Sequence, residues 1–103
     1  MAKKVDFKNI LACVRHWCIW NKGRVIEGLD PKVWRMDCFG NFIKWDEYGN
    51  RNSRFGWEHD HILPVSWNGS DRLDNLRPLQ WKSNVLRHVL RQRLLKPQAK
   101  TAR

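Results

Sequence analysis

Residues 57–64, WEHDHILP, place four ionisable side chains in a row between a tryptophan and an apolar Ile-Leu pair. The flanking residues are typical of a strand, but burying such a run is costly unless its charges are paired or bind a metal. Two of the chain's four histidines, His59 and His61, fall within the run. We therefore expect a strand that ends at a functional site.

The chain has 103 residues and a mass of 12.4 kDa, which is enough for one domain with a modest core. It contains no apolar run near the roughly 18 residues of a membrane span, and no signal-peptide-like run near its start, so we expect a cytoplasmic protein without a membrane partner. The three cysteines form no C-x-x-C pair. This argues against a four-cysteine zinc site and predicts buried, reduced thiols.

The chain is strongly basic, with a formal net charge of +10, which predicts attraction to a polyanion such as nucleic acid. No acidic residue follows Asp74. The alternative is a solvated basic tail that only aids solubility. The basic residues that we expect to contact DNA are Arg77, Lys82, Arg87, Arg91, Arg93 and Lys96.

Periodicity predicts an α+β fold. Residues 6–20 have helical spacing behind a possible Asp6 cap, and residues 33–46 alternate around Gly40 and Asn41 as in a hairpin. Strands are expected over 57–63 and 75–80, joined by a polar loop. A helix follows over 83–95, with leucine and valine on its apolar side, and ends before Pro97. Most of the seven tryptophans are expected in the core, including Trp57, Trp67 and Trp81.

Several polar residues can converge in the strand, loop, strand and helix unit. Asp60 and His61 end its first strand, Asn75 opens the second, and Asn84 lies in the first helical turn with His88 one turn later on the same face. A carboxylate, an amide oxygen and an imidazole around one point can hold a divalent cation. A histidine beside that cation is suited to activate water as a general base.

Residues 56–84, GWEHDHILPVSWNGSDRLDNLRPLQWKSN, resemble the signature of HNH endonucleases, in which an Asp-His pair is followed by an Asn and, nine residues later, by an Asn or His. Asn75 and Asn84 have this spacing. The segment DPKVWRMDCFGNFIKWDEYGNRNSRFGWE, upstream, resembles small bacterial and phage members without zinc-binding C-x-x-C pairs. The likeness spans roughly residues 30–88 and implies a ββα-metal finger at about 54–95, with an added N-terminal helix and hairpin. It predicts one nuclease domain over 1–96 and a basic tail over 97–103.

The resemblance implies a metal-dependent endonuclease that hydrolyses phosphodiesters of DNA, most simply double-stranded, to 5′ phosphate and 3′ hydroxyl ends. His61 would be the general base, which requires a neutral imidazole near pH 7. Asp60 and Asn84 would bind one divalent metal ion, Mg²⁺ or Mn²⁺, and Asn75 would bridge the loop and orient the base. With His88 as a further ligand, as in colicin-type nucleases, Ni²⁺ or Zn²⁺ also becomes suitable.

Other interpretations stay open at this point. His88 can instead contact a DNA phosphate, and His59 can be a packed polar residue, because family members usually have an aliphatic residue there. Glu58 can support the site from a distance or pair with an arginine, and His16 needs no chemical role. The whole chain can also be a non-catalytic nucleic-acid-binding module or a phage-packaging accessory with an HNH fold.

Overall fold

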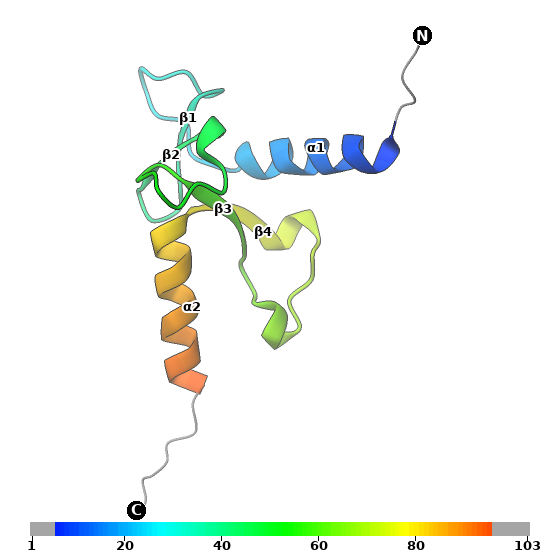
Figure 1. Cartoon of the computed structure of the whole chain (residues 1–103), viewed down its shortest axis with the longest axis vertical. Coiled ribbons are helices and arrows are strands. Elements are labelled where there is room, and N and C mark those ends of the chain that lie inside the picture. Colours follow the sequence, from blue (N-terminus) through cyan, green and yellow to red (C-terminus); the bar gives the residue numbers. More distant parts are fainter. Residues whose placement is uncertain (1–5, 96–103) are drawn as a thin grey trace, which may run out of the picture.

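The computed structural model describes residues 6–95 and is a small α+β domain with two helices and two two-stranded antiparallel sheets (Figure 1). The predicted tail and Lys96 lie outside these residues. The order of elements is α1 Phe7–Trp20, β1 Trp34–Met36, β2 Phe42–Lys44, η1 Trp45–Glu47, β3 Trp57–His61, η2 Val65–Trp67, η3 Leu73–Asn75, β4 Leu76–Gln80 and α2 Trp81–Leu95, where η denotes a 3₁₀ turn.

Helix α1 begins where the sequence predicts. The Asp6 carboxylate accepts a hydrogen bond from the backbone N–H of Lys8 at 3.0 Å, which satisfies a donor that the first helical turn leaves free. At the other end, Arg35 of β1 donates to the backbone oxygens of Asn21 and Gly23 at 3.2 and 3.0 Å. These bonds attach the end of α1 to the hairpin.

The predicted hairpin is formed by β1 and β2, and its turn contains Gly40 with a φ of +85°. Asp37, only 2% exposed, accepts from the backbone N–H groups of Phe39, Asn41 and Gln80 at 2.8 to 3.0 Å. A buried carboxylate is tolerated when it is hydrogen-bonded in this way. Asp37 thereby joins the hairpin to the end of β4.

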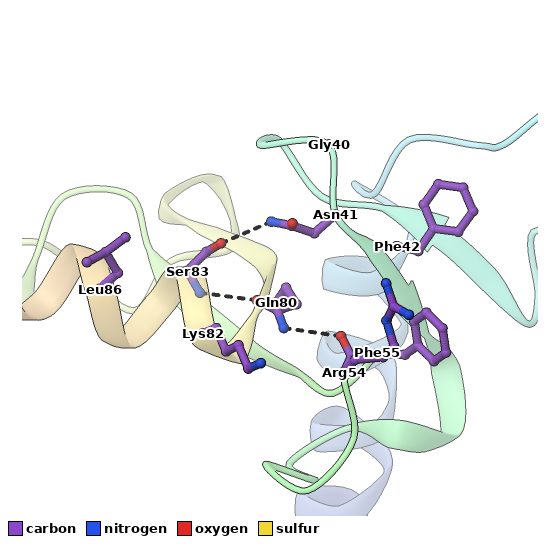
Figure 2. Close-up of a pocket in the computed structure, with 9 residues that line it drawn as sticks. All are labelled: Gly40, Asn41, Phe42, Arg54, Phe55, Gln80, Lys82, Ser83 and Leu86. Atoms are coloured by element: carbon purple, nitrogen blue, oxygen red, sulfur yellow. Dashed lines mark hydrogen bonds between the residues drawn. The ribbon is translucent and has the colours of Figure 1, made fainter.

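Strands β3 and β4 pair antiparallel, and α2 follows β4 without a loop. The hairpin also contacts the start of this helix, because Asn41 Nδ2 donates to Ser83 Oγ at 3.0 Å (Figure 2). Gln80 continues the connection by donating to the Arg54 carbonyl at 3.1 Å and accepting from the Ser83 N–H at 3.2 Å. The first turn of α2 is therefore fixed to both sheets.

The core is formed by Ile19, Trp20, Ile43, Trp57 and Leu76, all at most 3% exposed. The prediction that most of the seven tryptophans lie in the core is wrong, because only Trp20 and Trp57 are buried. Trp17 and Trp67 are 59% and 45% exposed, and the other three tryptophans are half-buried. Trp67 lies in η2, in the connection that follows β3.

The two helices point away from the sheets in different directions (Figure 1), and most of their side chains over residues 7–14 and 85–94 are exposed. The apolar side of α2 is exposed; Val85, Leu86, Val89, Leu90 and Leu94 are 36% to 80% exposed. The prediction of buried thiols is also wrong for Cys13 and Cys38, which are exposed. Neither helix in residues 6–95 has the length and apolar character needed to cross a membrane.

Candidate functional site

One groove brings together four of the five residues predicted to form the site. Its cavity of about 280 Å³ is lined by Asp60 and His61 from β3 and by Asn84 and His88 from α2. The fifth residue, Asn75, lies in the loop beneath the end of β3. The groove residues of β3 and α2 come together because β4 runs directly into α2. The first two turns of α2 therefore lie beside β3, the strand that pairs with β4.

Asp60 is held by two arginines. Its Oδ2 accepts from Arg77 Nε at 2.8 Å and from Arg87 Nη1 at 2.7 Å, and the carboxylate is 3% exposed. Arg77 is its cross-strand partner in β4, and Arg87 lies in the second turn of α2. Two residues expected to contact DNA are thus already bonded to the proposed metal ligand. In residues 6–95 no hydrogen bond reaches Asp60 Oδ1, which remains available for a further ligand.

His61 contacts a carboxylate that the sequence analysis did not assign. Its Nε2 lies 2.7 Å from Oδ1 of Asp71, which is 84% exposed in the loop between the two strands. When the imidazole is neutral and donates its Nε2 proton to Asp71, its Nδ1 carries the free lone pair. Asp71 can therefore orient the His61 imidazole so that its Nδ1 accepts a proton. Asp71 follows Gly69 and Ser70 in the stretch between His61 and Asn75, and no periodicity or spacing in that stretch marks it as a partner of His61.

Asn75 bridges the loop, as the resemblance implied. Its side chain accepts from the Leu63 N–H at 2.8 Å and donates to the carbonyls of Leu63 and Ser70 at 3.0 and 2.7 Å. One amide therefore ties the segment after His61 to the segment before Asp71.

Asn84 is oriented by a glutamate. Its Nδ2 donates to Glu58 Oε1 at 2.9 Å, which leaves its Oδ1 as the end that can bind a cation. Glu58 is in turn held by two hydrogen bonds from Arg51, at 2.7 and 2.9 Å. The Arg51 hydrogen bonds are the main reason that the pKa of Glu58 lies below its usual value, although partial burial opposes the shift. Glu58 is therefore the partner of an arginine, one of its two suggested roles, and it also bonds Asn84.

His59, which also lines the groove, is hydrogen-bonded to α1. Its Nε2 lies 2.8 Å from Nδ1 of His16, and the His16 ring stacks on Trp57 with centroids 4.9 Å apart. Burial, followed by the charges of His16, Arg15 and His61, lowers the pKa of His59 to about 4. Burial also lowers the pKa of His16. His16, expected to need no role, packs with the groove-lining strand.

The remaining basic residues are divided between the two sides of α2. Arg91 lines the groove, and its Nη1 is buried without a hydrogen-bond partner among the described residues. Arg93 is exposed. Lys82 lies on the other side of the helix, where with Arg54 it borders a larger cavity of about 680 Å³ (Figure 2). Arg51 and Arg54 are cations that the sequence analysis did not assign.

Ligand chemistry limits which metal ions fit the groove. Within residues 6–95 no three His, Cys, Asp or Glu side chains form a cluster that could hold a metal ion. The donors that remain are the carboxylate of Asp60, the amide oxygen of Asn84 and the imidazole of His88. With two oxygens and one imidazole as protein ligands, the other coordination positions of the ion would be filled by water, which suits Mg²⁺ and Mn²⁺.

The chain was compared with protein-family models, curated proteins and solved structures, and no match was found in any of the three.

Proposed function

We propose that the protein is a metal-dependent HNH endonuclease with a ββα-metal finger formed by β3, β4 and α2, and that it hydrolyses DNA phosphodiester bonds. The observation that carries this proposal is that Asp60, His61, Asn84 and His88 line one groove. Each of the first three also has a hydrogen-bond partner that fixes its orientation. Supporting partners of this kind are what keep catalytic groups in a productive geometry.

In the proposed reaction, Nδ1 of His61 accepts the proton of the water that attacks phosphorus. Asp71 accepts the Nε2–H hydrogen bond and stabilises the imidazolium that forms. Asp60 Oδ1, Asn84 Oδ1 and His88 would hold a divalent metal ion, which would supply charge stabilisation to the phosphate. As the bond from the water oxygen to phosphorus forms, the bond from phosphorus to the 3′ oxygen breaks, and solvent water gives that oxygen a proton. Arg91 Nη1, buried and without a hydrogen-bond partner within residues 6–95, can donate to a phosphate oxygen in the same groove.

The high positive charge supports DNA as the substrate. Arg77 and Arg87 each keep further N–H donors beyond the one bonded to Asp60, since a guanidinium has five. We expect DNA binding to depend mainly on phosphate contacts, so affinity should fall steeply with salt and differ little between sequences. A titration in which one DNA sequence binds more than about 10³-fold tighter than unrelated DNA would contradict this expectation.

The alternative is a non-catalytic nucleic-acid-binding or packaging module, and one observation favours it. The two guanidiniums bonded to Asp60 already compensate its buried charge, so this carboxylate does not need a metal ion for stability. The alternative predicts DNA binding without cleavage at any divalent metal concentration.

Cleavage of supercoiled plasmid with Mg²⁺ or Mn²⁺ distinguishes the two functions. The His61→Ala variant should nick the plasmid about 10² to 10⁴ times more slowly than wild type, the usual contribution of a general base. The control is Asp46→Ala, an exposed residue of η1 remote in sequence from the groove. Cleavage that persists unchanged in His61→Ala, or in excess EDTA, would contradict the proposal.

A further inference from the structure

Helix α1 is exposed over residues 7–14 and buries a face only in its last turn. The buried face carries Ile19 and Trp20, which are 0% and 2% exposed, in the last turn of the helix. The opposite face carries the five apolar side chains that form what we call the α1 stripe. They are Phe7, Ile10, Leu11, Val14 and Trp17, with exposed fractions of 75%, 44%, 61%, 50% and 59%.

The stripe is continuous. At 3.6 residues per turn its members fall within an arc of about 120°, which is the width of a helical face that packs against a partner. The part of α1 that carries the stripe extends away from the sheets (Figure 1). Helix α1 contacts β4 and η3, and through the hydrogen bond of His16 with His59 it also contacts β3. Scattered exposed apolar residues need no explanation, but a contiguous stripe indicates an interaction surface.

The spacing of the stripe suits pairing with a second copy of the same helix. Phe7, Ile10, Val14 and Trp17 follow one another at intervals of three, four and three residues, as the a and d positions of a coiled coil do. This order reads the same in both directions along the helix. An antiparallel, two-fold pairing with a second copy therefore places Phe7 against Trp17 and Ile10 against Val14, aromatic with aromatic and aliphatic with aliphatic.

A lipid surface fits the helix less well. Interfacial helices are rich in Lys and Arg along their polar face. Over Phe7–Trp20 the only Lys and Arg residues are Lys8 and Arg15, and Arg15 donates to the Asp71 carbonyl at 2.7 Å. Both lie beside the stripe rather than within it, so neither would have to be buried between two copies.

We propose that the α1 stripe is a homodimerisation surface on which two copies of the chain pair antiparallel about a two-fold axis. Five side chains from each copy would bury at most roughly 1,000 Å² in total, at the lower limit for a specific interface. The dimer should therefore be weak and concentration-dependent. Because each chain carries a net charge of +10, added salt should strengthen it, opposite to the effect of salt on binding to DNA or anionic lipid. This inference does not rest on the proposed nuclease activity.

Sedimentation of the full chain tests the proposal. As its concentration rises, wild type should change from the 12.4 kDa monomer to a species of twice that mass, with a dissociation constant below about 100 µM. This dissociation constant should fall as the salt concentration rises. Ile10→Glu and Val14→Lys each change two symmetric contacts and should weaken the dimer by about 30-fold or more. Both positions are exposed, and Glu and Lys favour helices, so circular dichroism should show an unchanged fold.

Mixing the two variants tests the direction of pairing. In an antiparallel dimer of Ile10→Glu with Val14→Lys, the new glutamate meets the new lysine and the other contact stays apolar, so dimerisation should recover. In a parallel dimer each new charge meets an apolar residue and recovery is not expected. Three results would overturn the proposal: a monomeric wild type up to about 100 µM, no recovery on mixing, or a monomer that binds anionic vesicles through the stripe.

Discussion

Nε2 of His61 lies 2.7 Å from Oδ1 of Asp71, a residue in the loop that returns from β3 to β4. Asn75 closes the same loop by bonding Leu63 and Ser70, so the chain segment that carries Asp71 is held next to the imidazole. The His61 side chain remains 31% exposed and open to solvent. The loop thus orients the proposed base while leaving it accessible to substrate.

Asp71→Asn should slow cleavage, because an amide accepts the Nε2–H hydrogen bond less strongly and does not stabilise the imidazolium. We expect a loss of about tenfold, less than for removal of the base itself, since Asp71 is highly exposed and its charge is screened. The matched control is Asp74→Asn in the same loop, whose carboxylate is 73% exposed and 3.7 Å from Arg72. Equal rates for the two variants would contradict the role of Asp71.

Glu58→Gln should weaken metal binding without removing a ligand. The glutamine amide can present its nitrogen to Asn84, in which case the Asn84 side chain turns and its oxygen no longer faces the groove. Loss of a supporting partner typically costs about 10- to 100-fold in metal affinity. Calorimetry with Mn²⁺ measures this. The control is Glu47→Gln, whose carboxylate also accepts from an asparagine, Asn50, at 2.8 Å but away from the groove. Unchanged Mn²⁺ affinity in Glu58→Gln would refute the prediction.

His88→Ala tests the third proposed ligand. The side chain lines the groove with Asp60 and Asn84, and an imidazole shifts metal preference from Mg²⁺ toward Mn²⁺, Ni²⁺ or Zn²⁺. The variant should bind Mn²⁺ and Zn²⁺ about tenfold more weakly, the low end of losses at metal sites, and should retain activity with Mg²⁺ better than with Mn²⁺. Gln92→Ala, another groove residue on α2, is the control. If calorimetry gives equal affinities for wild type and His88→Ala, water rather than His88 completes the site.

The histidine pair predicts how stability depends on pH. The pKa of His59 is about 4 in the folded protein and ~6.5 in an unfolded chain, so between these values the unfolded state binds a proton that the folded state does not. The free energy of unfolding should therefore fall as pH falls through this window, and His16, whose pKa is also lowered, adds an effect of the same sign.

Denaturant unfolding in metal-free buffer between about pH 7 and pH 5 measures this effect before the carboxylates titrate. In His59→Leu the free energy of unfolding should depend less on pH over the same range. A wild type whose stability is constant over this range would show that the pair is not held neutral by the fold.

The sequence predicted the order of elements well, because caps, turns and periodicity are local signals. Asp6 caps α1, and Gly40 lies in the hairpin turn. It did not predict the partners of the site residues. The hydrogen bond between Glu58 and Asn84 depends on how α2 packs against β3. The contact between Asp71 and His61 depends on the path of the loop between β3 and β4. Neither is encoded by a short stretch of sequence. Periodicity also gave α1 an apolar face but could not show that this face would be left uncovered.

Gly69→Ala tests the loop that holds the proposed base. A Cβ at this position would lie 1.7 Å from the Leu63 carbonyl oxygen and 2.7 Å from that of Pro64, and both are backbone atoms. The loop must therefore open, which strains the Asn75 bonds to Leu63 and moves Asp71 away from His61. We expect a loss of about 1–3 kcal/mol in the free energy of unfolding, as for other overpacked sites. The cleavage rate should also fall when it is measured at a temperature where the variant is still folded, so the loss is not due to unfolding.

Ser70→Ala, an exposed neighbour that keeps its backbone carbonyl for Asn75, is the control. A Gly69→Ala variant with wild-type stability and activity would show that the close approach of Gly69 to Leu63 is not required.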